Sequence, residues 1–107
     1  MALTLWVGAH CANFKYVDPI LQFNGTTATC AIDVKVDDGV KFNATMTFYR
    51  VEGSKDVLLK EWGTSATTSL EHEGTRNGLI SGETYKLTVR ASANGETVTK
   101  SVTATCP

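Results

Sequence analysis

The chain has 107 residues, of which 42% are hydrophobic and 20% are charged, and its formal net charge is −1. This length fits one domain with a single two-layer core. The near-neutral charge excludes the broad positive field of a nucleic-acid-binding protein, and the sequence has no run of five like charges that would dock on an acidic membrane surface.

Short segments that alternate between apolar and polar residues follow one another along the chain. Segments 20–23 and 27–36 flank Asn24-Gly25, a dipeptide typical of tight hairpin turns. Segments 40–49 and 57–62 come next, and Gly63 is expected to end the second of them. A weaker segment, mostly Thr and Ser, covers 65–73, and 74–78 is expected to be a loop.

The last third of the chain alternates most clearly. Every second residue from Tyr85 to Ala91 is apolar, Asn94-Gly95 supplies a hairpin turn, and a last strand follows around 98–104. Lys100 falls on the apolar face of that strand, so we expect it to reach an edge of the sheet or to mark a local irregularity.

Period-two alternation predicts half-buried strands, and no stretch of eleven or more residues carries helical spacing. The abundance of Thr and Val favours strands as well, because both carry two heavy atoms on Cβ. We therefore predict an all-β fold, a seven-stranded antiparallel sandwich. The chain is expected to form one domain, 1–107, with 1–12 as an N-terminal segment and 13–107 as the sandwich core.

The stretch Leu79-Ile80-Ser81-Gly82-Glu83-Thr84-Tyr85 resembles the tyrosine corner of fibronectin type III and related immunoglobulin-like domains. In that motif a Leu lies six residues before the Tyr and a Gly three before it, which matches Leu79 and Gly82. Ser81 stands where the family usually has Pro. The resemblance implies an immunoglobulin/fibronectin-III-like sandwich in which Tyr85 is buried and its hydroxyl bonds backbone near Leu79–Gly82.

A looser resemblance, carried by 24–30, 46–50 and 60–62, is to small secreted domains of Gram-positive gut bacteria with no assigned function. It implies a bacterial, secreted origin and no mechanism.

The three cysteines, Cys11, Cys30 and Cys106, form no C-x-x-C pair of the kind that binds zinc. In an immunoglobulin-like topology the first hairpin and the end of the last strand lie at the same pole, which favours a Cys30–Cys106 disulfide. A Cys11–Cys106 disulfide and three reduced thiols remain as alternatives.

Large aromatic residues are the best candidates for a binding site. Trp62, Tyr49 and Trp6 would stack on sugar rings or anchor a protein partner if they are exposed. The alternative interpretation is that Trp62 covers the edge of the core and that Trp6 tucks the N-terminal segment onto a sheet. No acid/base pair or activated nucleophile can be named, so we predict no enzyme activity, no catalytic residues, no cofactor and no metal site.

These observations favour a non-catalytic extracellular module: an adhesion, spacer or binding domain of a secreted or surface protein. Its expected partner is an unidentified protein or glycan, with no nucleic acid and no direct membrane insertion. The alternatives are a carbohydrate-binding module that uses exposed aromatics and a phage virion decoration domain.

Overall fold

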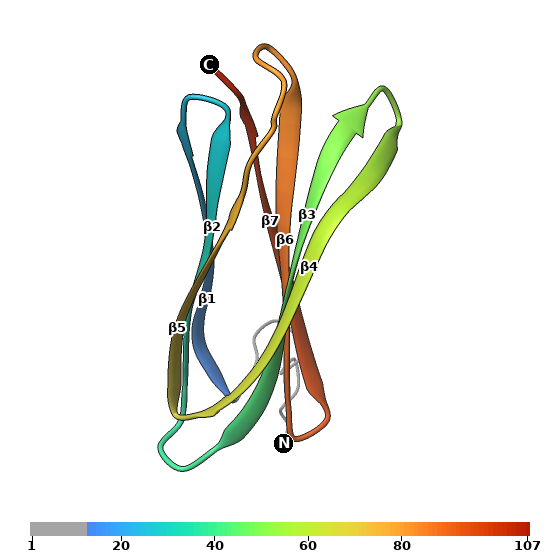
Figure 1. Ribbon diagram of the computed structural model, residues 1–107. Helices are drawn as coiled ribbons and strands as arrows, with labels where there is room; N and C mark the ends of the chain where they lie inside the picture. Colours follow the sequence, from blue (N-terminus) through green and yellow to red (C-terminus); the bar gives the residue numbers. More distant parts are fainter. Residues whose placement is uncertain (1–12) are drawn as a thin grey trace.

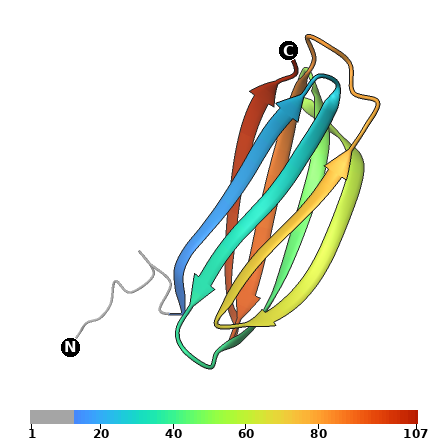
Figure 2. The ribbon, with the colours of Figure 1, turned by 60° about the vertical axis from the view of Figure 1, so that its left-hand side comes forward.

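The computed structural model describes residues 13–107, which form a sandwich of two antiparallel β-sheets (Figures 1 and 2). The strands are β1 (Phe14–Asn24), β2 (Thr27–Val36), β3 (Lys41–Glu52), β4 (Lys55–Thr67), β5 (Ser69–Arg76), β6 (Thr84–Ala93) and β7 (Glu96–Thr105). One sheet has the order β1-β2-β5 and the other the order β4-β3-β6-β7. The predicted all-β class, the number of strands and their antiparallel pairing are confirmed.

The core lies between the two sheets and consists of the residues that the alternation selects. In β2 every second side chain is buried from Ala28 to Val36, and in β6 from Tyr85 to Ala93. The largest fully buried side chains are Tyr85, Phe48, Ile32, Met46 and Leu87. Their burial stabilises the fold, because removing one such apolar side chain from water contributes about 1.5–3 kcal/mol.

The last hairpin reverses where the sequence predicts it. Asn94 has φ 49° and Gly95 has φ 80°, so both residues of the turn are left-handed, as a type I′ turn requires. Ala93 and Glu96 flank this turn as paired residues, and the register then continues without a shift to Thr84 and Thr105.

The strand expected to end at Gly63 does not end there. β4 continues through Gly63 to Thr67, and the chain changes sheets at Thr68, whose φ is 69°. Three hydrogen bonds hold this residue against the β2–β3 turn: Val36 N–H to the Thr68 carbonyl, Thr68 N–H to the Val40 carbonyl, and Gly39 N–H to the Thr68 hydroxyl. Hydrogen bonds to the β2–β3 turn, rather than Gly63, therefore fix the end of β4.

Lys100 lies on β7, which ends its sheet in the described part of the chain, and its side chain is exposed. The expectation that this residue reaches an edge is confirmed.

The ends of the strands gather at two poles of a body that measures 52 × 27 × 17 Å. The C-terminal pole carries the β1–β2 turn, the β3–β4 turn, the β5–β6 connection and Pro107 (Figure 1). The Asn13 pole carries the β2–β3 turn, Thr68, the β6–β7 turn and Asn13. The described fold therefore begins at one pole and ends at the other.

The predicted Cys30–Cys106 disulfide is wrong, because both thiols are free. Cys106 does lie at the pole of the first hairpin, and its Sγ–H donates to the carbonyl of Gly25 at 3.4 Å. Cys30, however, is three residues further along β2 than Thr27, about 10 Å from the strand's start. The sequence therefore predicts the correct pole for Cys106, but it does not predict how far Cys30 lies from that pole along β2. Cys11, which belongs to the alternative pairing, lies outside the described residues.

We expect Cys30 to resist alkylation in the native protein. Its side chain is 0% exposed, and burial raises the pKa of the thiol to about 12, which suppresses the reactive thiolate. Cys106 is also buried but lies one residue from Pro107, where fraying opens it more often. Iodoacetamide labelling at pH 8, followed by peptide mapping, should therefore show Cys106 reacting before Cys30. Equal labelling rates, or a peptide that links the two cysteines, would contradict this prediction.

Candidate functional site

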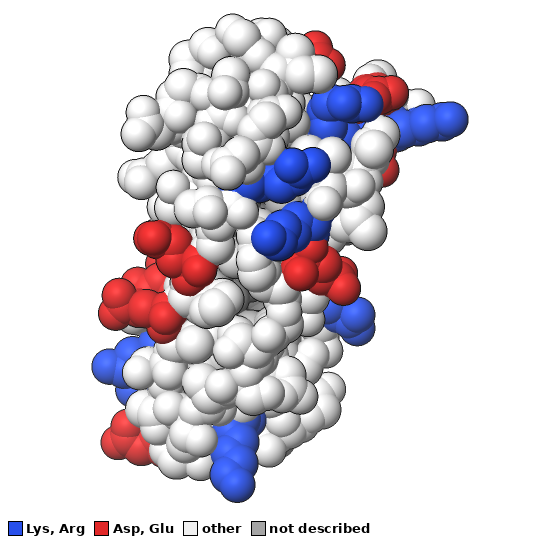
Figure 3. All heavy atoms as spheres, in the orientation of Figure 1, with Lys and Arg blue, Asp and Glu red and all other residues white. Residues whose placement is uncertain are grey.

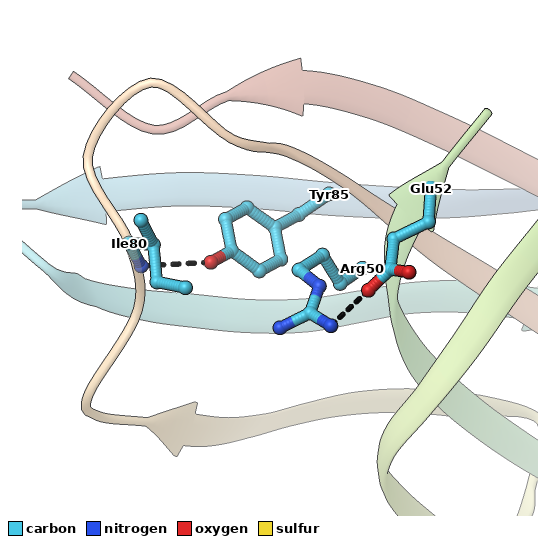
Figure 4. Close-up of polar contacts among 4 residues, drawn as sticks. All are labelled: Arg50, Glu52, Ile80 and Tyr85. Atoms are coloured by element: carbon cyan, nitrogen blue, oxygen red, sulfur yellow. Dashed lines mark hydrogen bonds and ion pairs between the residues drawn. The ribbon is translucent and has the colours of Figure 1, made fainter.

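Tyr85 anchors the β5–β6 connection at the C-terminal pole (Figure 4). Its side chain is 1% exposed, and its ring stacks on Phe48 with the centroids 5.4 Å apart. The hydroxyl accepts a hydrogen bond from the backbone N–H of Ile80 at 2.8 Å. The buried ring and its hydrogen bond are those that the sequence motif predicts, and the donor lies between Leu79 and Gly82.

Leu79 and Gly82 attach the same connection to its surroundings. The N–H of the buried Leu79 donates to the carbonyl of Thr26 at 2.9 Å. Gly82 has φ 89°, a conformation that residues with a Cβ rarely adopt, and its N–H donates to the carbonyl of Cys106 at 2.9 Å. The corner therefore ties the connection to the first hairpin and to the end of the chain, which is a structural role.

Arg50 also lies in this region, although it is not among the site residues predicted from the sequence. It is paired with Tyr85 across β3 and β6, and its guanidinium lies near the Tyr85 ring in Figure 4. A hydrogen bond to Glu52, and then the charge of that carboxylate, raise the pKa of Arg50. Its Nε is buried without a hydrogen-bond partner in the described part of the protein. The side chain as a whole is 28% exposed, so water reaches the guanidinium and we assign it no ligand.

Trp62 covers the edge of the core rather than presenting a free face. It pairs with the buried Met46 and packs partly buried against the core cluster. Its indole lies directly over Gly74 of β5, where a Cβ would be only 2.5 Å from Cε2. The ammonium of Lys60 lies 5.3 Å from the centroid of the indole. The sequence places Gly74 in a loop, but β5 continues to Arg76 and the glycine allows this close approach.

Tyr49 lies on the opposite side of the same sheet. It pairs with Lys86, whose ammonium is 5.6 Å from the centroid of the Tyr49 ring and 2.6 Å from a carboxylate oxygen of Asp56. Trp62 points toward the core, so the two rings do not form one stacking platform. Trp6, the third candidate, lies outside the described residues.

The outer face of the four-stranded sheet is covered with hydroxyl groups, and we call it the hydroxyl face. Cross-strand hydroxyl pairs join β6 to β7 at three levels: Thr84–Thr105 at 3.3 Å, Thr88–Ser101 at 2.8 Å and Ser92–Thr97 at 3.0 Å. On the β3–β4 side, the hydroxyl of Thr47 donates to a carboxylate oxygen of Glu61 at 3.2 Å. These side chains are the polar half of the alternation, so the sequence does contain the signal for this face.

A shallow basin of about 400 Å³ lies in the hydroxyl face. Its lining includes Thr47, Tyr49, Glu61, Thr88, Arg90 and Thr99. A carboxylate that accepts hydrogen bonds, a guanidinium that donates them, and hydroxyls that do both therefore surround one aromatic side chain. Sequence reasoning identified Tyr49 but missed Glu61 and Arg90, because it did not establish which strands lie side by side.

The outer face of the three-stranded sheet carries a row of like charges. Asp33 of β2 pairs with Asp18 of β1 on one side and with Glu71 of β5 on the other. Partial burial, and then the nearby Asp33 carboxylate, raise the pKa of Tyr16 in the same area. Like charges directly opposite each other are destabilising, so this row reduces stability slightly.

On the side seen in Figure 3, charged side chains of both signs are separated by broad uncharged areas, as expected for a net charge of −1. In residues 13–107, no group of three His, Cys, Asp or Glu side chains is placed to hold a metal ion. No helix in this range is long and apolar enough to cross a membrane. The sequence matches no known protein family and no curated protein.

Proposed function

We propose that this protein is a non-catalytic extracellular module of the fibronectin type III or immunoglobulin-like class, which serves as an adhesion, spacer or binding domain of a secreted or surface protein. The strand order β1-β2-β5 and β4-β3-β6-β7 and the buried Tyr85 corner support the class. Fold class alone does not define a function.

The placement of the two ends carries this proposal. Asn13 bonds to the β6–β7 hairpin at one pole, whereas Cys106 bonds to the β1–β2 turn at the other. The fold between them is 52 Å long. Chain that precedes Asn13 and chain that follows Pro107 would therefore leave from opposite poles, which suits modules arranged end to end along a surface protein.

Two experiments test the proposal. Antibody detection on intact cells and in the culture medium should find the protein outside the cytoplasm, and confinement to the cytosol would contradict the extracellular role. Small-angle X-ray scattering of two copies joined in tandem should give a rod about twice the 52 Å length of one copy. A compact particle with the copies side by side would contradict the spacer role.

A glycan-binding role is a second candidate, favoured by the basin in the hydroxyl face. Sugar recognition uses a few placed polar groups beside an aromatic surface, and the basin offers the Glu61 carboxylate, the Arg90 guanidinium and the Tyr49 side chain. Lys86 and Asp56 lie at the Tyr49 end of this face, so the Lys86 ammonium would also contact a ligand that reaches the ring.

We expect Glu61→Gln to lower the affinity for a glycan identified on an array by about tenfold, because a charged hydrogen bond contributes roughly 1.5 kcal/mol or more. Glu71→Gln removes the same charge from the other sheet and should leave the affinity unchanged. Isothermal titration calorimetry with the array hit gives both values. Equal losses in the two variants, or no glycan retained at all, would contradict a site in the basin.

A further inference from the structure

A second basin, of about 520 Å³, lies in the hydroxyl face beside the one described above, and we call it the Lys41 basin. Its lining includes Lys41, Asn43, Ser65, Thr67 and Ser92. Asn43 of β3 pairs with Ser92 of β6, and the next outward-facing pair of the same two strands, Thr45 and Arg90, lines the first basin. The two basins therefore adjoin.

Together the two basins form one shallow groove that follows β3. Every second residue of β3 from Lys41 to Tyr49 lines it, over eight residues or about 27 Å of strand. Strands β4 and β6 flank the groove, because they pair with β3 on its two sides. A groove of this length fits an extended chain better than a single small molecule.

The neutral polar groups of the groove suit a ligand that is rich in hydroxyls. The hydroxyl of Ser65 donates to Oδ1 of Asn43 at 2.8 Å, so the Asn43 amide keeps both of its N–H donors. Thr88 and Ser92 each share one hydrogen bond with β7 and can still donate or accept another. Sugar hydroxyls do both, so they can bond to all of these groups.

The groove also holds cations that no carboxylate of the described chain neutralises. The ammonium of Lys86 is paired with Asp56, whereas Lys41 and Arg90 form no ion pair in the part of the chain that the structure describes. The lining of the Lys41 basin contains no acidic residue. Arg90 lies opposite Thr45, four residues along β3 from Lys41, so the two positions are about 14 Å apart.

We propose that this groove binds an extended acidic polysaccharide, a chain of sugars that carry carboxylates. The inference rests on the glycan-binding role proposed above. The guanidinium of Arg90 holds one carboxylate through two parallel hydrogen bonds, and the ammonium of Lys41 neutralises another further along the chain. Glu61 lies across β3 from Arg90, where it accepts a hydrogen bond from a sugar hydroxyl.

The charge density of the groove favours this polymer over nucleic acid. Duplex DNA carries one charge per about 1.7 Å of its axis, and its binding requires many cations in close succession. Lys41 and Arg90 are far apart by comparison, and the whole chain has a net charge of −1. A polysaccharide with isolated carboxylates and many hydroxyls matches both the wide spacing of these cations and the neutral groups between them.

Isothermal titration calorimetry with oligosaccharides of alginate, polygalacturonate and hyaluronan, each beside its carboxyl-reduced neutral form, tests the proposal. At least one acidic form should bind about tenfold or more tightly than its neutral counterpart, because reduction removes the charged hydrogen bonds to Arg90. Arg90→Gln should abolish most of this preference. Lys41→Gln should weaken the acidic form about threefold, and Lys35→Gln, which removes the same charge from the outer face of the other sheet, should have no effect.

Three results would overturn this assignment. Equal affinity for acidic and neutral forms would remove the acidic specificity and leave the glycan site in place. A loss in Lys35→Gln as large as that in Lys41→Gln would mean that overall charge, rather than the groove, attracts the polymer. If no acidic oligosaccharide binds, the inference fails, and the glycan array decides separately whether the groove takes a neutral sugar.

Discussion

Replacing Gly74 with alanine is expected to lower the free energy of unfolding by about 2–3 kcal/mol. The new Cβ would lie 2.5 Å from Cε2 and 2.6 Å from Nε1 of Trp62, well inside contact distance. The indole is rigid and packs against the core, so relief requires a shift of the ring or of β5. An ordinary Gly-to-Ala change in a strand stabilises by about 0.5–1 kcal/mol, so here even the sign is reversed. Urea denaturation measures the difference.

Gly63→Ala is the matched control for this prediction. Gly63 also lies within a strand, but apart from its two chain neighbours no described residue comes within 4 Å of a Cβ built on it. This variant should therefore be neutral or slightly more stable than the wild type. In a Trp62→Leu background, the cost of Gly74→Ala should fall below about 1 kcal/mol, because a smaller, flexible side chain moves away. If Gly74→Ala is as mild as Gly63→Ala, then the indole does not lie over β5.

The two glycines show why the sequence located the strands but not their boundaries. A glycine in a strand indicates either a turn or a close approach by another group, and the local sequence looks the same in both cases. Gly63, the predicted end of a strand, lies inside β4, whereas Gly74, which falls in a predicted loop, lies in β5. Only the packing of the neighbouring sheet distinguishes a turn from a close approach. The indole that approaches Gly74 belongs to Trp62, which is 12 residues away in the chain, so the local sequence does not reveal it.

The inward faces could be predicted because alternation is a local property. The buried residues of β2 and β6 follow from one-dimensional spacing alone, and so does the side of the sheet on which Tyr49 lies. The basin could not be predicted, because Glu61 and Arg90 lie on strands that flank β3 on opposite sides. Strand order is set by the packing of the whole domain.

The cysteines also show that topology could be predicted from the sequence, whereas exact distances could not. Topology placed the end of β7 beside the first hairpin, and the contact of Cys106 with Gly25 agrees with it. A disulfide also needs the right depth along the strand, with Cα atoms within about 7 Å of each other. That distance depends on register and strand length, which the spacing of cysteines does not encode.

Removing the Tyr85 side chain should cost more than any other change argued above. Tyr85→Ala is expected to lower the free energy of unfolding by about 3–5 kcal/mol, because it leaves a cavity beside Phe48 and Phe23. Tyr85→Phe keeps the ring and removes only the acceptor for the Ile80 N–H, so it should account for about 1–2 kcal/mol of that loss. Both values come from urea or thermal denaturation of the full chain.

Tyr49→Phe is the control that separates the hydrogen bond from the loss of a hydroxyl in general. Tyr49 lies on the hydroxyl face, and phenylalanine keeps the ring that faces the ammonium of Lys86, so the stability should change by no more than about 0.5 kcal/mol. In Tyr85→Phe, the amide of Ile80 should also exchange faster, while the amide of Leu87 in the centre of β6 should not. If Tyr85→Phe leaves both the stability and the Ile80 amide unchanged, the hydroxyl does not hold the β5–β6 connection, and the corner depends on the packing of the ring alone.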